Sequence, residues 1–250
     1  MRYFLDISYL GTAYHGWQIQ QNANTVQAEI NRALSLLLQE DLACLGSGRT
    51  DTGVHASQQI AHVDLSELKF PVSLLQVRLN TVLPNDISIN NITLVHDEAH
   101  ARFDATKRTY HYHISKSKNP FQIRQSYHFT RPLNVHKIQQ ALEVIKKTRD
   151  FQAFSKVHTE VNNFDCEIFD VYWRETNDSY TFCVSANRFL RGMVRAMAGT
   201  LLDVGIEKIS LEEFKSILES GDRSKAGRSV PAEGLFLSKV EYPNLVYLAN

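Results

Sequence analysis

Apolar and polar residues alternate from Tyr3 to Tyr9, which is the pattern of a strand with one buried face. Similar runs predict further strands at 42–45, 58–63, 87–95, 109–114, 164–174, 180–186 and 235–240. The turn-forming residues Thr176-Asn177-Asp178 separate the runs 164–174 and 180–186. We therefore expect these two strands to form a hairpin.

Apolar residues at helical spacing predict helices between these strands. The first begins after Thr25, whose hydroxyl suits an N-cap, and runs to Leu38; a second begins at Pro71 and runs through Leu79. The others are expected at 135–147, 189–202 and 211–218. Strands and helices interspersed in this way favour an α+β fold, divided into residues 1–105 and residues 106–250.

Length and composition exclude several classes of protein. The chain of 250 residues can bury one large core or two smaller ones. No apolar run is long enough to cross a bilayer, and Asp6 comes too early for a signal peptide, so we expect a cytoplasmic protein. The cysteines Cys44, Cys166 and Cys183 are widely spaced and odd in number, which favours buried thiols over a disulfide framework or a zinc site.

The formal net charge is zero, but the charges are unevenly distributed. Residues 102–149 contain eleven basic side chains and two acidic ones, and the stretch 185–202 adds Arg188, Arg191 and Arg195 without an acid. Basic clusters of this kind are typical of nucleic-acid-binding surfaces. Solvated faces balanced by acids elsewhere in the fold would give the same pattern, so charge alone does not decide between the two.

The segment Gly46-Ser47-Gly48-Arg49-Thr50-Asp51-Thr52-Gly53 lies between two predicted strands. Its glycines permit unusual backbone angles and the close approach of a ligand. A nearby arginine lowers the pKa of a carboxyl group, so Arg49 would hold Asp51 ionised, as a nucleophile or a base requires. A purely structural loop, in which Asp51 forms an Asx-turn and pairs with Arg49, is the alternative.

Asp51-Thr52-Gly53 is also the tripeptide of the aspartic proteases. Those enzymes need two carboxylates that share a proton. The chain has one such tripeptide, so a dimer would have to supply the second, and Arg49 would oppose the sharing of a proton. The predicted helices also do not suit an all-β protease, and the sequence therefore disfavours this class.

Five further blocks accompany the signature Gly48-Arg49-Thr50-Asp51-Thr52-Gly53-Val54-His55-Ala56, at 11–20, 25–27, 101–112, 187–195 and 231–235. Together, in order and along nearly the whole chain, they resemble the tRNA pseudouridine synthase A family. The resemblance implies an isomerase that converts uridine to pseudouridine in the anticodon stem-loop of tRNA (positions 38–40), acting as a homodimer. Pseudouridine formation moves the ribose bond from N1 to C5 of the same base, so neither a redox cofactor nor a metal is expected.

The resemblance also implies a fold. It is a mixed, largely antiparallel sheet in two similar halves flanked by helices, with the active-site cleft between the halves. The first half would carry the Asp51 loop, and the second would carry a tyrosine strand and an arginine helix.

The family pattern assigns roles to individual residues. Asp51 is the catalytic carboxylate, and attack on the sugar, attack on the base and removal of a sugar proton all stay open as its first step. The target base must leave its helix, and Tyr110 matches the tyrosine that stacks on it. Tyr110 is also a catalytic candidate, which would help to remove the C5 proton. Arg49 orients Asp51 or fills the space that the base leaves, while Arg195 pairs with Asp51. Phosphate contacts are expected from Lys107, Arg108 and Arg191.

Two positions depart from the family pattern. Thr52 stands where alanine is usual, and Arg191-Gly192 replaces a more typical Tyr/His pair. The second departure is expected to add a phosphate contact or to change helix packing. The basic stretch also leaves open an RNA-binding protein without catalysis, in which Lys107 and Arg108 would matter and Asp51 would not.

Overall fold

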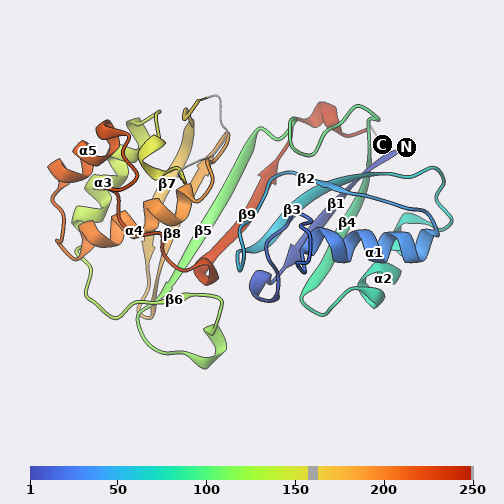
Figure 1. Ribbon diagram of the computed structural model, residues 1–250, viewed down its shortest axis with the longest axis horizontal. Coiled ribbons are helices and arrows are strands. Elements are labelled where there is room, and N and C mark those ends of the chain that lie inside the picture. The colour runs from blue at the N-terminus through green and yellow to red at the C-terminus, as the bar shows by residue number, and fades with distance from the viewer. Residues whose placement is uncertain (157–162, 249–250) are drawn as a thin grey trace. The chain divides into compact units, whose positions relative to one another are not determined.

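The alternating N-terminal segment forms strand β1 (Arg2–Tyr9), shown in the computed structural model of Figure 1. β1 pairs antiparallel with β4 (Ile87–Val95) on one side and with β3 (His55–Asp64) on the other. The short β2 (Leu45–Gly46) pairs antiparallel with β3, and β9 (Leu235–Glu241) lies parallel to β3. The structure describes residues 1–156 and 163–248.

Two helices accompany these strands, α1 (Val26–Leu38) and α2 (Val72–Val82). The Thr25 hydroxyl accepts a hydrogen bond from the Ala28 amide at 3.4 Å, which confirms the predicted N-cap. Ile30 and Leu34, four residues apart on α1, are completely buried. α1 packs against α2, and α2 packs against β4. The helical spacing of the apolar residues thus gives α1 its buried face.

Further strands follow in the order β5 (Lys107–Ser115), β8 (Ser179–Ala186), β7 (Ile168–Glu175), with β6 (Tyr127–His128) parallel to β5. The predicted hairpin of β7 and β8 is confirmed, and the Thr176 amide donates to the Ser179 carbonyl at its turn. Three helices pack together beside these strands, α3 (Val135–Lys147), α4 (Met193–Gly205) and α5 (Leu211–Ser220). Short 3-10 helices are η1 (Gly11–Ala13), η2 (Pro120–Gln122), η3 (Gln152–Phe154), η4 (Ala232–Gly234) and η5 (Asn244–Val246).

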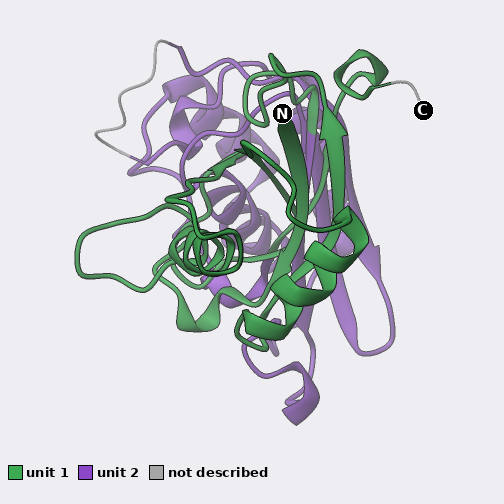
Figure 2. Cartoon of the chain, turned by 90° about the vertical axis from the view of Figure 1, so that its right-hand side faces the viewer, with its two compact units in different colours: residues 1–107, 236–250 green, residues 108–235 purple. Residues whose placement is uncertain are grey.

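Figure 2 shows how the chain divides into two compact units. Unit 1 comprises residues 1–107 and 236–250, and unit 2 comprises residues 108–235. The sequence suggested halves at 1–105 and 106–250; the chain crosses to unit 2 after Lys107, and it returns to unit 1 because β9 pairs with β3. The α+β class and the mixed, largely antiparallel strand pairing are confirmed.

Several sequence predictions of secondary structure were wrong in their extent, among them the strand expected at 164–174, which begins only at Ile168. Residues 42–44 are not a strand, because α1 rather than a neighbouring strand satisfies their backbone. The Asn31 side chain accepts from the Cys44 amide, and the Gln27 amide group donates to the Cys44 carbonyl. The helix expected at 189–202 begins only at Met193, since Gly192 adopts a left-handed conformation that helical residues do not take.

The structure also bears on the cysteines and on membrane insertion. Cys44, Cys166 and Cys183 are buried and free, as the sequence predicted. Within residues 1–156 and 163–248, no helix combines the length and the apolar character that a bilayer span requires.

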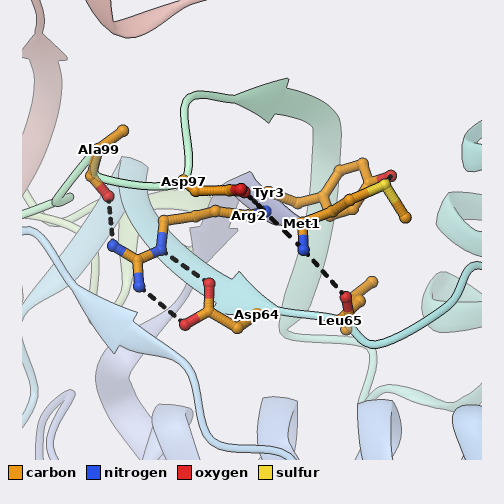
Figure 3. A network of polar contacts seen from close by, with 7 residues as sticks. All are labelled: Met1, Arg2, Tyr3, Asp64, Leu65, Asp97 and Ala99. Atoms are coloured by element: carbon orange, nitrogen blue, oxygen red, sulfur yellow. Dashed lines mark hydrogen bonds and ion pairs between the residues drawn. The ribbon is translucent and has the colours of Figure 1, made fainter.

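The N-terminus of β1 is fixed by a network of polar contacts (Figure 3). The Arg2 guanidinium donates two hydrogen bonds of 2.8 Å to the Asp64 carboxylate and a third, of 2.9 Å, to the Ala99 carbonyl. These bonds hold the pKa of Asp64 below its usual value, although burial opposes them. The N-terminal ammonium donates to the Leu65 carbonyl at 3.3 Å. One arginine therefore links β1 to the end of β3 and to the segment after β4.

His62 lies beside this network, in the interior of unit 1. Its side chain is buried, and its Nδ1 accepts a hydrogen bond of 3.1 Å from the Ala101 amide. The His100 ring lies 4.6 Å from it, centroid to centroid. Burial, together with the positive charge of Arg2, lowers the pKa of His62 to about 4. His62 is therefore neutral in the folded protein at pH 7.

His62 should make the stability of the protein sensitive to mild acid. The pKa of His62 is about 4 when folded and roughly 6.5 when unfolded. Between these two pH values His62 is protonated in the unfolded chain but neutral in the folded protein. The contribution of His62 to stability therefore falls as the pH falls. From pH 7 to pH 5 the loss from this group is about 2 kcal/mol.

This loss is measured by urea unfolding of the wild type and of His62→Gln at pH 7 and at pH 5. The pH dependence of the variant should be weaker by that amount, because glutamine does not titrate. Equal pH dependence in the two proteins would show that His62 is not the responsible group.

Candidate active site

The signature loop lies in unit 1 between β2 and β3, and several hydrogen bonds fix its two ends. The Ser47 hydroxyl donates to the Gln59 side chain at 2.6 Å, and the Gln59 amide group donates to the Gly48 carbonyl at 2.9 Å. At the other end, the Val54 amide donates to the Asp51 carbonyl at 3.1 Å and closes a turn. The segment between these anchors has no regular secondary structure, so tertiary contacts set its conformation.

The block at residues 11–20 packs directly against the signature loop. The Trp17 amide donates to the Thr50 carbonyl at 3.3 Å, and the Tyr9 hydroxyl is hydrogen bonded to the Thr50 hydroxyl at 2.8 Å. Gly16 has φ of +89°, and a Cβ placed there would lie 2.3 Å from the Thr50 carbonyl oxygen. The close approach of the two segments therefore requires glycine at this position.

Burial varies along the loop and distinguishes residues with a structural role from the candidate catalytic residues. Thr50 is 8% exposed and faces Tyr9, whereas Arg49 is exposed and Asp51 is half-buried. Thr50 thus anchors the loop, while the two charged residues beside it remain accessible. This arrangement suits a carboxylate that must reach a substrate and still keep a fixed backbone position.

His55 in the same signature has a structural role that the sequence did not reveal. Its side chain is completely buried, and its Nδ1 accepts a hydrogen bond of 3.0 Å from the Gly11 amide. Its ring lies 4.5 Å from that of Phe236, centroid to centroid. His55 therefore joins the first block and β9 to the base of the signature loop. A backbone acceptor role of this kind leaves no spacing pattern in a sequence.

Tyr110 and Tyr112 share one face of β5 in unit 2, but their environments differ. Tyr112 is completely buried, and its hydroxyl donates to the Pro231 carbonyl at 2.9 Å. Burial raises its pKa far above the ordinary value for tyrosine. Tyr110 is half-buried, and its ring meets that of Phe189 edge to face with 5.0 Å between centroids. Tyr112 is thus the core tyrosine, whereas Tyr110 keeps part of its ring exposed.

The arginine helix of the sequence prediction is α4, also in unit 2. Arg195 lies in its first turn, and its Nε donates to the Val230 carbonyl at 2.7 Å. Arg191 precedes the helix and is exposed. Gly192 is the N-cap residue with φ of +73°, a left-handed conformation that glycine adopts without strain. Gly192 of the pair Arg191-Gly192 therefore sets the direction in which the chain enters α4.

Lys107 and Arg108 are neighbours in sequence, yet they belong to different units. The ammonium group of Lys107 lies 3.3 Å from the Glu241 carboxylate in unit 1, and both side chains are about one-third exposed, at 37% and 34%. Arg108 in unit 2 donates to the Asn187 carbonyl at 2.9 Å. Each cation thus has a partner within its own unit, and this partner fixes the position of the charge.

The structure therefore divides the predicted site residues into two sets. Unit 1 brings Arg49 and Asp51 together on one loop and also carries Lys107. Unit 2 carries the second set, which consists of Arg108, Tyr110, Arg191 and Arg195. Each set comes from segments that hydrogen bonds hold in a defined local conformation.

Comparison with known proteins identifies the family. A family described as "tRNA pseudouridine synthase" matches residues 7–104 and 148–243. A protein of Bacteroides fragilis named "tRNA pseudouridine synthase A" is 44% identical over 248 residues, covering 98% of each chain. A Bacillus subtilis protein of the same name is 40% identical over 248 residues, which cover 98% of this chain and 100% of that protein. One from Ruminiclostridium cellulolyticum is 43% identical over 95% of this chain and 98% of its own.

These matches confirm the resemblance carried by the signature Gly48–Ala56 and its accompanying blocks. They exclude the aspartic protease, as do the helices of both units. They also exclude an RNA-binding protein without catalysis. The chain belongs to the tRNA pseudouridine synthase family and is an isomerase.

Proposed function

We propose that this protein isomerises uridine to pseudouridine in the anticodon stem-loop of tRNA, at positions 38–40, with Asp51 as the catalytic carboxylate. The observation that carries the proposal is the signature loop itself. It anchors Thr50 in the interior and keeps the Asp51 carboxylate half-buried beside an exposed Arg49. Family membership supplies the reaction type.

The chemistry of the reaction agrees with a site made of side chains alone. The bond from ribose to N1 of uracil breaks, and a bond from the same ribose carbon to C5 forms. The C5 proton is released to solvent, and N1 takes up a proton from solvent. All atoms and electrons are conserved, so the reaction itself consumes no oxidant, reductant or second substrate. A carboxylate can begin it by attack on the sugar, by attack on the base or by removal of a sugar proton.

The other site residues hold the target base, orient Asp51 and bind the tRNA. A base inside a stacked helix must be flipped out before a carboxylate can reach it. The partly exposed ring of Tyr110 then stacks on the flipped base, and Arg49 occupies the space left behind or orients Asp51. Arg195 pairs with Asp51 and fixes its charge. Contacts to tRNA phosphates come from Lys107, Arg108 and Arg191.

The proposal includes two further expectations about the protein in its cell. It acts as a homodimer that binds tRNA across both subunits, and it works in the cytoplasm, where tRNA is used. Both rest on the family and on the relatives named "tRNA pseudouridine synthase A".

Asp51→Asn should abolish catalysis while leaving tRNA binding nearly unchanged. Asparagine has the shape of aspartate but cannot act as a nucleophile or a base, so turnover should fall by about 10³-fold or more. Release of tritium from tRNA labelled at C5 of uridine measures turnover, and filter binding measures affinity. Asp41→Asn, an exposed carboxylate of the same unit, is the matched control and should keep full activity. Turnover that persists in Asp51→Asn would disprove the role assigned to Asp51.

The two tyrosines on one face of β5, Tyr110 and Tyr112, allow a second test. Tyr110→Ala should weaken tRNA binding by about tenfold, because stacking on an aromatic ring contributes roughly 1–3 kcal/mol per base. Tyr110→Phe keeps the ring and should bind as the wild type does. Tyr112→Phe should cost about 1 kcal/mol of folding stability through its lost hydrogen bond, with no effect on tRNA affinity. Stacking by Tyr110 is refuted if Tyr110→Ala binds tRNA as tightly as Tyr110→Phe.

A further inference from the structure

The most exposed large apolar side chain among the described residues is Phe121, which is 90% exposed. It lies in η2, within the loop that joins β5 to α3 in unit 2, and Ile123 beside it is 58% exposed. This loop, residues 116–134, extends beyond the end of β5 (Figure 1). Exposed apolar side chains next to one another often mark a contact site, and the role proposed for Asp51 does not involve these two.

The loop has a defined conformation that holds Phe121 outward. The Asn119 side chain accepts a hydrogen bond of 2.9 Å from the Phe121 amide. The Gln125 amide donates to the Gln122 carbonyl at 3.1 Å, and Arg124 has φ of +61°, which is uncommon for a residue other than glycine. β6 pairs with β5 at the base of the loop. The backbone is thus satisfied locally, while the two apolar side chains remain in solvent.

The charged side chains of this loop are all basic. Between Asp104 and Glu143 the sequence contains no acidic residue. Lys116 forms an ion pair of 2.7 Å with Glu175. The other cations of the loop, Lys118, Arg124 and Arg131, are exposed and form no ion pair with any residue in 1–156 or 163–248. An exposed ring among unpaired cations is the combination that single-stranded nucleic acid requires, since bases stack on the ring while phosphates meet the charges.

We propose that Phe121 stacks on an unpaired base of the bound tRNA, with Lys118 and Arg124 on the adjacent phosphates. This contact is additional to the stacking of the reacting base on Tyr110. The charge favours RNA over a second copy of the chain, because two copies of this loop would bring like charges together. The inference rests on the proposed function, since it takes tRNA as the ligand. A contact away from the reacting base contributes to affinity and leaves the chemical step unchanged.

Phe121→Ala tests the contact directly. The dissociation constant for an unmodified tRNA transcript should rise about tenfold, as expected for the loss of one stacked base. Turnover at saturating tRNA should remain that of the wild type. The slope of log Kd against log salt should not change in Phe121→Ala, whereas Arg124→Ala should reduce that slope by about one, because one phosphate contact is lost. Leu36→Ala, which truncates an apolar side chain of α1 that is 60% exposed, should alter neither quantity.

A fluorescence experiment places the base on the ring. Trp17 and Trp173 are 2% and 8% exposed, so Phe121→Trp adds one exposed indole to two buried ones. Unmodified tRNA should quench this indole, and a fully paired RNA duplex of similar length should not. Quenching by both RNAs alike, or by neither, would overturn the proposal.

The remaining outcomes separate this proposal from its alternatives. Wild-type affinity in Phe121→Ala, with the wild-type enzyme forming pseudouridine in the same tRNA, would overturn the loop contact alone. A wild-type protein that forms no pseudouridine in tRNA would instead overturn the proposed function. If Phe121→Ala changes the sedimentation behaviour of the free protein as well as its affinity, the ring belongs to a contact between subunits and the RNA contact is rejected.

Discussion

The Trp17 amide donates to the Thr50 carbonyl, and that same oxygen lies where a side chain on Gly16 would have to be. Two backbone segments far apart in sequence can meet this closely only if one of them lacks a Cβ. Thr50 is thereby fixed, with its hydroxyl on Tyr9, and Asp51 follows it in the chain. The position of the candidate catalytic carboxylate thus depends on a backbone contact at the residue that precedes it.

Buried polar groups elsewhere in unit 1 also fix the positions of loops. His55 and His62 are both buried on β3, and each accepts a hydrogen bond from a backbone amide, of Gly11 and Ala101 respectively. A buried acceptor that lacked a donor would cost more than such a bond contributes, so each histidine strongly favours the one loop arrangement that supplies the donor. The two loops so fixed are the first block, which packs against Asp51, and the segment that leads into the basic stretch.

Local rules explain most of the secondary structure. Thr25 capped α1 as its hydroxyl suggested, and the hairpin of β7 and β8 closes at the turn residues after Glu175. The strand expected at 42–44 shows where local rules fail. Residues 42–44 resemble a strand by composition, yet α1 binds their backbone through Gln27 and Asn31. Side chains from distant segments decided the outcome there, and a local pattern cannot register them.

The sequence by itself determined the family and the candidate site residues: the signature with Arg49 and Asp51, the tyrosine strand and the basic stretch. These are properties of residue identity and spacing, which a sequence records directly. Only the tertiary structure decided that Tyr112 is the core tyrosine while Tyr110 stays partly exposed, that β9 returns to unit 1, and that Phe121 is held in solvent. Burial and pairing depend on which segments meet, and contacts between residues far apart in the chain set that.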